Sequence, residues 1–408
     1  MLDIKLIREN SGLFKRNLQK RGAKDKLKML EELIIKDKKV RKSKFDIDKL
    51  KAQRNKISKE IGELKKAKKS ATKKMKEASN IPKNIKKKEE EISKLEERIK
   101  FILMRLPNLM HESVPKGKDD SENVEIRKWG NVPKFKFEAK DHLTLLRNLD
   151  LIDTERAAKV AGHGFHYLKN ELVILDRAII SFTIDYMMKK GFTLYSPPYM
   201  VNKEIAEGST DLQEFNDVIY KIENHDLYLN PTAEFAMLGL LKDEVLNLKD
   251  LPLKVIGVSP SFRKEVGTHG KYTKGLYRMH QFNKVEQVVF CKPEDSWEIF
   301  EELQKTTEEI FKKLEIPYRV VNVCTGDLGI KQAKQYDIEG WMVDGIYRER
   351  TSCSNCTDFQ ARRLNIRYRE KEGQKPKDFV HILNNTAIAT SRAMVSIVEV
   401  NQKKDGTV

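Results

Sequence analysis

Arginines and carboxylates gather in three segments of the last two-fifths of the chain. The segments cover residues 262–286, 347–363 and 386–395. A guanidinium presents a planar fork of donors that fits a phosphate or a carboxylate, whereas a lysine supplies only a point charge. Because such forks recur here together with carboxylates, the sequence predicts a site that holds a triphosphate next to an amino acid.

Five side chains carry the prediction of a nucleotide site. Arg263 can hold an α-phosphate. Glu265, two residues further along the same expected strand, shares its face and can accept a hydrogen bond from the adenine amino group. Arg278 can reach the outer phosphates. Phe282 offers a flat platform for a purine, and Arg392 can cover the other purine face while it reaches the γ-phosphate.

A loop with several glycines separates the two expected strands of the first segment. Gly267, Gly270 and Gly275 allow this loop to fold over a ligand and to open again. Taken alone, the first segment could equally be an ordinary β-hairpin with surface arginines. The presence of all three segments in this order favours the binding site.

The first and third segments, FRKEVGTHGKYTKGLYRMHQFNKVE and TAIATSRAMV, resemble motifs 2 and 3 of class II aminoacyl-tRNA synthetases. Together with ERTSCSNCTDFQARR, they resemble the seryl-tRNA synthetase family in detail. The resemblance implies that Arg263, Arg278 and Arg392 are catalytic. It also implies that Glu349 and Ser352 hold Mg²⁺ with the phosphates, because hard oxygen ligands suit this ion. The residues implied to bind ATP are Arg263, Lys264, Glu265, Met279, Phe282, Glu349, Arg350, Thr351, Ser352 and Arg392.

A second group of residues implies that the amino acid is serine. The resemblance assigns serine binding to Thr232, Glu234, Arg263, Glu286 and Thr386. Glu286 matches the family's glutamate that accepts from the serine hydroxyl. A site built around a hydroxyl rejects analogues without it by ~10⁴ or more, whereas an extra methyl group is worth only ~1–3 kcal/mol, so threonine is the expected competitor. On its own, the Thr232 to Glu234 stretch could be a plain helix start with Thr232 as N-cap.

The four cysteines and eight histidines are not expected to bind a structural metal. Cys353 and Cys356 form a CxxC, but Cys291 and Cys324 are the remaining cysteines. We predict that the cysteines pack in the interior and that the chain has no zinc site. The histidines show no H-x-x-x-H spacing, and we interpret them as structural or surface residues.

The composition indicates a cytoplasmic protein with a polyanionic partner. The chain has 408 residues, of which 34% are charged, and its formal net charge is +18. A charged start, four cysteines and the lack of a long apolar run predict neither a signal peptide nor a membrane span. The excess of positive charge predicts binding to a polyanion.

Much of this charge lies in a segment with heptad spacing. Residues 31–100 contain 25 Lys or Arg and 13 Asp or Glu. Apolar residues repeat on alternating three- and four-residue steps, with a break expected at 80–82. We therefore predict an N-terminal domain over 1–110 with a long antiparallel coiled coil at about 30–108. A dimerisation coil is the alternative, but an excess of lysine would repel a second copy. The family resemblance implies that this arm binds tRNA(Ser).

The remaining chain is predicted to be a linker over 111–140 and a catalytic domain over 141–408. Short β-patterned runs alternate with helices, which indicates the α+β class, with an antiparallel sheet flanked by helices. A helix over 172–190 leads into a strand that ends near Pro198. This arrangement resembles motif 1 and implies a homodimer through that region.

The resemblance implies an ATP-dependent ligase that joins L-serine to tRNA(Ser) through a seryl-adenylate, with tRNA(Sec) as a further candidate substrate. Three alternatives stay open: another class II synthetase, for threonine or proline; a non-translational paralogue; and an RNA-binding coiled-coil scaffold with an inactive catalytic domain. The chain departs from the family pattern at Tyr272, Lys274 and Arg350, and in the residues that follow Glu399.

Overall fold

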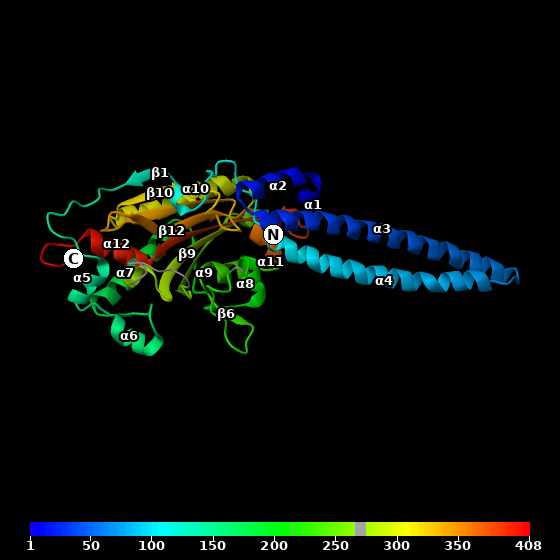
Figure 1. The fold of residues 1–408 in the computed structure, drawn as a ribbon, viewed down its shortest axis with the longest axis horizontal. Helices are drawn as coiled ribbons and strands as arrows, with labels where there is room; N and C mark the ends of the chain where they lie inside the picture. Colours follow the sequence, from blue (N-terminus) through cyan, green and yellow to red (C-terminus); the bar gives the residue numbers. More distant parts are fainter. Residues whose placement is uncertain (214, 266–274) are drawn as a thin grey trace. The chain divides into compact units, whose positions relative to one another are not determined.

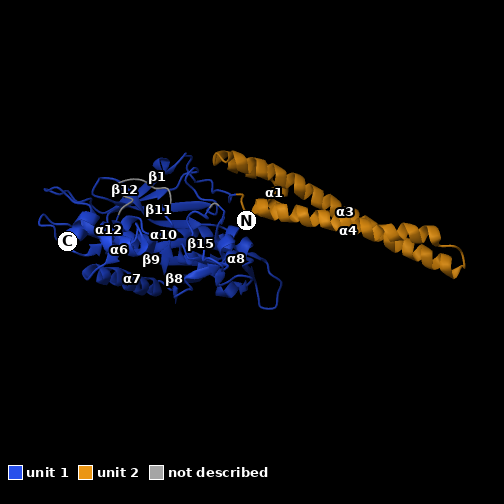
Figure 2. Ribbon diagram, turned by 60° about the horizontal axis from the view of Figure 1, so that its bottom comes forward, with its two compact units in different colours: residues 1, 107–408 blue, residues 2–106 orange. Residues whose placement is uncertain are grey.

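The computed structural model describes residues 1–213, 215–265 and 275–408. The chain forms two compact units, which Figure 2 shows in different colours. One unit consists of residues 2–106. The other consists of residues 107–408 together with Met1. Each unit is described separately below.

Residues 2–106 form a helical unit built on a hairpin of two long helices (Figure 1). Its helices are α1 (Ile4–Glu9), α2 (Ser11–Lys20), α3 (Lys24–Lys66) and α4 (Thr72–Leu103). Apolar residues at heptad spacing are buried along the seam between α3 and α4. Among the described residues, four ion pairs cross this seam: Arg98–Glu32 at 2.8 Å, Lys44–Glu96 at 2.7 Å, Lys88–Asp46 at 2.9 Å and Lys74–Glu60 at 2.7 Å. The long helix pair predicted from the heptads is confirmed.

The turn between α3 and α4 lies earlier than we predicted. We expected a break at 80–82, but α3 ends at Lys66 and the chain reverses at 67–71, where Lys68 has a φ of 49°. Pro82 lies inside α4. A proline in a helix interior costs about 3 kcal/mol or more. Ile81 and Ile85 are buried on either side of Pro82 and continue the seam, so packing outweighs the local break signal.

A buried carboxylate lies in the first half of α3, where α1 contacts it. Asp37 is only 4% exposed. It accepts hydrogen bonds from Arg8 at 2.7 and 2.9 Å and from Arg41 at 3.0 Å. Burial raises the pKa of Asp37, but the two guanidinium groups outweigh this effect and hold the pKa below its usual range.

The second unit is built on an eight-stranded sheet. In spatial order its strands are β1 (Val124–Trp129), β10 (Tyr318–Asn322), β11 (Lys334–Trp341), β12 (Tyr347–Asn355), β15 (His381–Ala389), β9 (Gln281–Cys291), β8 (Leu253–Phe262) and β4 (Thr193–Tyr195). All neighbours pair antiparallel except β4 and β8, which are parallel. The α+β class is confirmed, and the sheet is antiparallel apart from this one pair.

Alternation along β8 and β9 divides the apolar core into two parts. Val285 and Val289 of β9 join one cluster, and Val288 and Phe290 join the other. The two clusters lie on opposite faces of the sheet because successive side chains of a strand point to opposite sides. The first cluster includes residues of α7 (Glu171–Lys189), α10 (Ser296–Lys313) and α12 (Thr390–Val400), and the second includes residues of α8 (Lys203–Ser209), α9 (Ala233–Gly239) and α11 (Phe359–Leu364). Figure 1 shows α10 and α9 on opposite sides of the strands.

Smaller elements surround the sheet. The helices are α5 (His142–Asn148), α6 (Thr154–Ala161) and the 3₁₀ turns η1 (Asp120–Glu122), η2 (Leu248–Asp250), η4 (Gly275–Tyr277) and η5 (Pro293–Asp295). The strands are β2 (Ile152–Asp153), β3 (Tyr167–Leu168), β5 (Met200–Asn202), β6 (Leu227–Leu229), β7 (Val245–Asn247), β13 (Arg367–Arg369) and β14 (Asp378–Phe379). Pro198 lies between β4 and β5, where its missing N–H leaves no ladder position unpaired.

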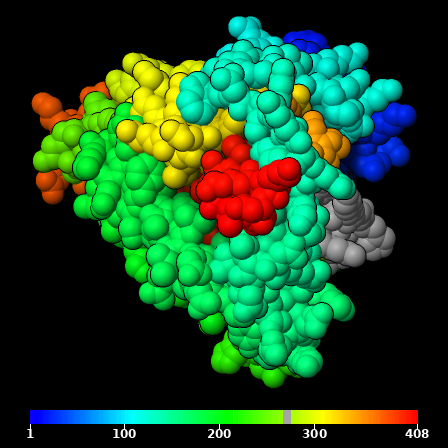
Figure 3. All heavy atoms as spheres, turned by 90° about the vertical axis from the view of Figure 1, so that its left-hand side faces the viewer, coloured from blue at the N-terminus to red at the C-terminus, as the bar shows by residue number. Residues whose placement is uncertain are grey.

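The segment predicted as a linker contributes to the sheet. Residues 124–129 within the expected 111–140 linker form β1, which pairs antiparallel with β10 at one edge. Proline, glycine and charged residues nearby suggested a flexible connection, but the Val124 to Trp129 stretch supplies an edge strand. The C-terminal segment lies at the surface (red in Figure 3). Gln402 there exchanges hydrogen bonds of 2.8 and 2.9 Å with the backbone of Lys140.

Candidate active site

The nucleotide side of the site begins just past the end of β8. Arg263 follows Phe262, the last residue of that strand, and its guanidinium carbon lies 5.4 Å from the ring centroid of Phe282 on β9. Its Nε donates to the carbonyl of Pro231 at 3.1 Å. Burial and the nearby Arg392 lower the pKa of Arg263, but an arginine stays charged. We predicted that Arg392 would cover a purine stacked on Phe282, but the guanidinium beside this ring in the fold is that of Arg263. Stacking of a purine on Phe282 stays a prediction.

Arg392 projects from the first turn of α12 toward β12. Its Nη1 lies 3.1 Å from Oε1 of Glu349. Its guanidinium carbon lies 5.2 Å from the ring centroid of Tyr277, and the Tyr277 hydroxyl donates to the Glu349 carbonyl at 3.3 Å. Burial raises the pKa of Glu349, but Arg392 and Arg263 outweigh it and hold that pKa below its usual range. Glu349 is therefore ionised at neutral pH.

A β-bulge at Arg350 decides which side chains of β12 share a face. Glu349 pairs with Glu339 of β11, and Ser352 pairs with Asp337 of the same strand, whereas Arg350 has no partner in the register. Cross-strand partners lie on one face, and residues 337 and 339 of β11 share a face. Glu349 and Ser352 therefore point to the same side although they are three residues apart, which a regular strand would forbid.

Arg350 itself is buried. It is 1% exposed, and its Nε donates to Oγ of Ser396 on α12 at 2.8 Å. Its side chain occupies the space where a Cβ on Gly340 would lie. Burial lowers the pKa of Arg350 to about 10. Thr351 is also buried. The ATP contacts predicted for Arg350 and Thr351 stay predictions.

Glu265 and Arg278 form an ion pair on either side of the glycine loop. Arg278 Nη1 lies 3.1 Å from Oε2 of Glu265. Glu265 was expected to continue the strand and share a face with Arg263, but β8 ends at Phe262 and Glu265 has a φ of 46°. Its position is that of a loop residue. The loop predictions for Gly267, Gly270, Tyr272 and Lys274 lie outside the described residues.

Lys264 and Met279, which were also predicted to bind ATP, make contacts within the protein. Lys264 donates from its Nζ to the carbonyl of Asn216 at 3.2 Å, and its own backbone N–H donates to the carbonyl of Val218 at 2.8 Å. Met279 belongs to the apolar core. A side-chain contact of Lys264 or Met279 with ATP stays a prediction.

A cluster of buried polar side chains, named the carboxylate pocket below, lies on the α9 face of the sheet, where residues 284 and 286 of β9 point. Glu286 is 2% exposed, and Thr386 lies directly opposite it on β15. The Thr386 hydroxyl donates to Glu286 Oε2 at 3.4 Å. Lys284, two residues earlier on β9, lies 2.5 Å from the same oxygen and donates to Thr232 Oγ1 at 3.2 Å. Burial and Glu234 raise the pKa of Glu286, although Lys284 opposes this effect.

Glu234 forms the far side of this pocket. It lies in the first turn of α9, and Thr232 is the N-cap of that helix. Glu234 accepts from Lys331, from Gln360 at 2.7 Å and from Asn384 at 3.3 Å. Burial lowers the pKa of Lys331, but Glu234 outweighs it and the pKa is raised. Thr232 is thus the helix N-cap, as one interpretation of residues 232–234 predicted. Serine binding by Thr232 and Glu234, the other interpretation, is compatible with this position and stays a prediction.

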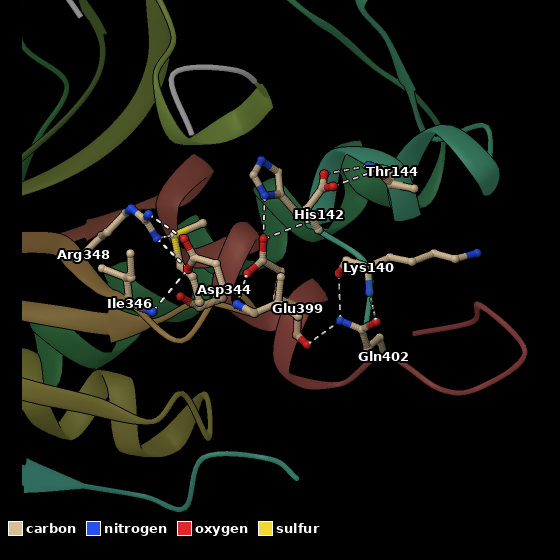
Figure 4. A network of polar contacts seen from close by, with 12 residues as sticks. Lys140, His142, Thr144, Asp344, Ile346, Arg348, Glu399 and Gln402 are labelled. Carbon is tan, nitrogen blue, oxygen red and sulfur yellow. Dashed lines mark hydrogen bonds and ion pairs between the residues drawn. The ribbon is translucent and has the colours of Figure 1, made fainter. Parts of the chain in front are cut away.

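A network of polar contacts holds the end of α12 in place at a distance from the site. Figure 4 shows a network at the end of α12. Glu399 accepts from His142 Nδ1 at 2.7 Å and from the backbone of Val343 at 2.9 Å. These contacts tie α12, which carries Arg392, to α5 and to the turn between β11 and β12.

The four cysteines are buried and free. Burial raises the pKa of the Cys353 thiol, and it raises the pKa of the Cys356 thiol to about 12.

Sequence reasoning missed four residues of this site. Lys284 and Lys331 pair with the pocket carboxylates, Tyr277 lies under Arg392, and Gln360 binds Glu234. Lys284 could have been found, because it shares a strand face with Glu286 at a spacing of two. Lys331 and Gln360 come from a loop and from α11, and no local pattern links them to the pocket.

The geometry brings a cationic side and a carboxylate pocket together. Arg263, Arg392 and Glu349 suit phosphates and a hard metal ion. Glu286 and Glu234 suit an ammonium and a hydroxyl group. Arg263 adjoins both parts, because it lies over Phe282 and donates to Pro231, the residue before Thr232. An acid and a triphosphate bound here would meet at this arginine.

Comparison with known proteins agrees with this site. The model for the class II core domain of tRNA synthetases (G, H, P, S and T) matches residues 218–401, and the model for the seryl-tRNA synthetase N-terminal domain matches residues 1–110. The serine–tRNA ligase of Thermococcus onnurineus is 52% identical over all of this chain and 94% of its own length. None of the helices in the described ranges combines the length and the apolar character that a membrane span requires.

Solved structures give the same result. The seryl-tRNA synthetase from Pyrococcus horikoshii, complexed with ATP, superposes with a TM-score of 0.98 at 50% identity and covers 100% of this chain and 96% of its own. The cytoplasmic serine–tRNA ligase from Naegleria fowleri, in complex with AMP, superposes with a TM-score of 0.90 at 31% identity and covers 99% of this chain and 94% of its own.

The largely antiparallel sheet, the arginines beside it and the match to the class II core-domain model define a class II aminoacyl-tRNA synthetase. The N-terminal helical unit narrows the assignment, since its model match is specific to one member of that class. The chain belongs to the seryl-tRNA synthetase family, the serine–tRNA ligases of class II.

Proposed function

We propose that the chain joins L-serine to tRNA(Ser) in an ATP-dependent reaction that passes through a seryl-adenylate. The position of Arg263 carries this proposal, because its guanidinium adjoins both the Phe282 platform and the carboxylate pocket. A serine carboxylate on one side and an α-phosphate on the other would both meet the same cation.

In the first step, a carboxylate oxygen of serine forms a bond to the α-phosphorus of ATP, and the bond to the bridging oxygen breaks to release pyrophosphate. In the second step, a hydroxyl of the terminal ribose of the tRNA attacks the seryl carbonyl and AMP leaves. No protein nucleophile takes part. Arg263, Arg278 and Arg392 would position the phosphates and offset the charge that develops on them.

Glu349 and Ser352 would hold Mg²⁺ against the phosphates. The bulge at Arg350 turns both oxygens to one face, and Arg392 and Arg263 keep the carboxylate ionised. Both features fit a hard divalent cation. Bound there, Mg²⁺ would supply charge neutralisation on the outer phosphates.

The serine assignment rests on the buried pocket. Glu286 would accept from the serine hydroxyl, while Thr232, Glu234 and Thr386 seat the remaining polar groups. Lys284 donates to Thr232, and Lys331 donates to Glu234. A buried carboxylate left without its hydroxyl partner would penalise alanine, so alanine should be rejected more strongly than threonine.

Three further properties extend the proposal. The basic helical unit would bind tRNA(Ser), and also tRNA(Sec) where that RNA is present. A homodimer would form near Pro198, since Ile174, Leu194, Tyr199 and Met200 are exposed apolar side chains of α7, β4 and their surroundings. The protein would act in the cytoplasm.

The test is amino-acid-dependent ATP–pyrophosphate exchange with each of the twenty amino acids at fixed Mg²⁺. We expect exchange with serine, with threonine as the main weak competitor. Arg263→Ala should abolish exchange, because the shared cation is lost. Exchange with another amino acid alone would contradict the serine assignment, and no exchange at all would favour the scaffold alternative.

A further inference from the structure

The carboxylate of Asp176 connects three elements of the unit that contains residues 107–408. Asp176 lies on α7 and is only 7% exposed, although Ile174, two residues earlier on the same helix, is 67% exposed. Its Oδ2 accepts a hydrogen bond from Asn283 Nδ2 of β9 at 2.8 Å, and its Oδ1 accepts from the hydroxyl of Thr390, the first residue of α12. The hydroxyl oxygen of Thr390 also lies 3.4 Å from the carbonyl oxygen of Asn283. One carboxylate thus joins α7, β9 and α12.

Both partners of Asp176 are close in sequence to side chains of the proposed nucleotide site. Asn283 follows Phe282, the proposed purine platform, and Thr390 comes two residues before Arg392. Because only one or two peptide units separate each partner from its neighbour in the site, a shift of Asn283 or Thr390 would also move that neighbour. Asp176 is therefore placed to set the distance between the strand that carries Phe282 and the helix that carries Arg392.

The start of α12 has no capping side chain of its own. Ala389 is the N-cap residue, and the first turn contains no acidic residue. The N-terminus of a helix carries a partial positive charge and unpaired N–H groups, so a carboxylate nearby is favourable. Asp176 supplies this carboxylate from α7 and reaches α12 through the Thr390 hydroxyl. The contact thus holds the end of α12 from which Arg392 projects.

A small cavity adjoins the three polar groups. Its volume is about 180 Å³, and the residues that line it include Asp176, Asn283, Thr390, Phe282 and Ser391. Packing fixes a side chain where neighbouring atoms contact it on all sides. Since the packing is incomplete here, the hydrogen bonds of Asp176 determine how β9 and α12 are spaced. Loss of these bonds would leave room for the start of α12 to shift.

We propose that Asp176 is a positioning residue for the ATP site, which holds the strand of Phe282 and the helix of Arg392 at the spacing that the nucleotide requires. The inference rests on the proposed function, which makes ATP the ligand of these two side chains. It adds a residue outside the site on which the geometry of the site depends. The carboxylate pocket lies on the opposite face of the sheet from α7, so a defect at Asp176 should appear in ATP binding and much less in serine binding.

The first test removes both acceptors of Asp176. Asp176→Leu keeps a similar size, and two quantities are measured: serine-dependent ATP–pyrophosphate exchange, and the Kd for ATP by calorimetry without serine. Because a misplacement of about 1 Å can cost about 100-fold, the Kd and the KM for ATP should rise about 10- to 100-fold, and the KM for serine should stay within about threefold. Asp176→Asn keeps an oxygen for Asn283 and an amide that can pair with the Thr390 hydroxyl, so it should recover most of the loss.

A second test deletes a single hydrogen bond. Thr390→Val keeps the branched shape of the side chain and removes the hydroxyl, whereas Thr390→Ser keeps the hydroxyl. Thr390→Val should raise the Kd for ATP about 3- to 30-fold, because one of the two hydrogen bonds of Asp176 is lost, and Thr390→Ser should stay near the wild type. The double variant Asp176→Leu/Thr390→Val should lose no more affinity than Asp176→Leu alone, since both changes remove the same contact.

The matched control is Asp185→Leu, which removes an exposed carboxylate from the same helix and should leave all constants at wild-type values. Thermal unfolding of each variant without ligand separates a folding defect from a positioning defect. Variants that unfold with the wild type but bind ATP weakly support the inference. An unchanged Kd in Asp176→Leu and Thr390→Val, equal rises in both KM values, or a multiplied loss in the double variant overturns it. If Asp176→Leu does not fold, Thr390→Val and Thr390→Ser decide.

The ATP titration distinguishes this failure from a failure of the proposed function. A wild-type chain that binds ATP without serine-dependent exchange would contradict the proposed activity, and the Kd values of the variants would still decide the role of Asp176. Exchange in the wild type together with an unchanged Kd in the variants would overturn the inference and leave serine activation standing.

Discussion

At the scale of single residues, the site depends on cations and carboxylates that hold one another in place. Lys284 and Glu286 form a buried pair at 2.5 Å, and Arg392 and Glu349 form a partly exposed pair at 3.1 Å. A buried pair contributes little net stability but is costly to break. Here the two pairs hold the charged side chains in fixed positions before the substrate binds. A substrate group that replaces one partner therefore meets a charge that is already oriented toward it.

Glu286→Gln tests the serine pocket. The amide keeps the shape of the side chain but removes the negative charge, and it leaves Lys284 without its ionic partner. We expect the KM for serine to rise about 10- to 200-fold in pyrophosphate exchange, the cost of losing charged hydrogen bonds of about 1.5–3 kcal/mol. The KM for ATP should change little.

The control for this substitution is Thr386→Ser, which keeps the hydroxyl that donates to Glu286. It should stay near wild-type activity. A Glu286→Gln enzyme with an unchanged KM for serine would remove Glu286 from the amino acid site.

Tyr277 is a positioning residue for Arg392. Its ring lies under that guanidinium, and its hydroxyl holds the Glu349 backbone. Tyr277→Leu should raise the KM for ATP about 3- to 30-fold, the range for a cation–π contact of about 0.5–2 kcal/mol, with a smaller change in the KM for serine. Tyr277→Phe keeps the ring and should recover most of the loss. Equal effects on both KM values would indicate a general structural defect.

At the scale of elements, the heptads of α3 and α4 could be predicted from sequence because a 3.5-residue period needs no tertiary information. The position of the turn could not. Pro82 is a strong local break signal, whereas the actual reversal at 67–71 contains lysines, alanines and a serine with neither glycine nor proline. The position of the turn depends on how the apolar residues of α4 pack against those of α3. This packing involves both helices and cannot be derived from a local signal such as Pro82.

The same limit applies in the catalytic unit. The arginines of motifs 2 and 3 were visible as sequence segments, but the bulge that turns Glu349 and Ser352 to one face depends on the partner strand β11. Strand β1 was hidden for a similar reason, because its few residues become a strand only beside β10. Lys331 joins the pocket from a loop, so only the fold reveals it.

Asp37 gives the helical unit a predictable response to acid. Its pKa is lowered in the folded chain, so its ion pairs contribute stability at pH values above the ordinary Asp pKa of ~3.9. That contribution is lost as pH falls through the lower folded value. Urea unfolding followed by helicity should show lower stability at pH 3 than at pH 6, and Asp37→Asn should reduce this difference.

At neutral pH, Asp37→Asn should cost about 1–3 kcal/mol, because two charge-assisted contacts weaken. Asp48→Asn on the same helix is the control, since Asp48 is exposed, and it should unfold like the wild type. A wild-type unit with equal stability at both pH values would contradict the assigned role of Asp37.

At the scale of the whole molecule, the chain divides its work between two units. The +18 net charge is concentrated in the helical unit, and the residues proposed as catalytic all lie in the other unit. The two activities should therefore be separable. We expect serine activation to need only the sheet and its helices, and transfer to RNA to need both units.

Replacing residues 49–85 with a short glycine-rich turn tests this division. The remaining parts of α3 and α4 keep the Arg98–Glu32 and Lys44–Glu96 pairs. We expect serine-dependent pyrophosphate exchange within twofold of the wild type and a loss of tRNA charging of at least about 100-fold, because several phosphate contacts disappear together. Charging that survives the replacement would show that the outer arm does not hold the RNA.

The cross-strand position of Thr386 opposite Glu286 constrains how the amino acid preference of such a chain can change. The two groups are fixed by the ladder between β15 and β9, in which a slip of one residue would turn every side chain to the other face. The pocket cannot be widened or narrowed gradually by sliding one strand. A change of preference must proceed by discrete exchanges of side chains on an unmoved frame, so intermediates along such a path should keep the fold and differ only in what they accept.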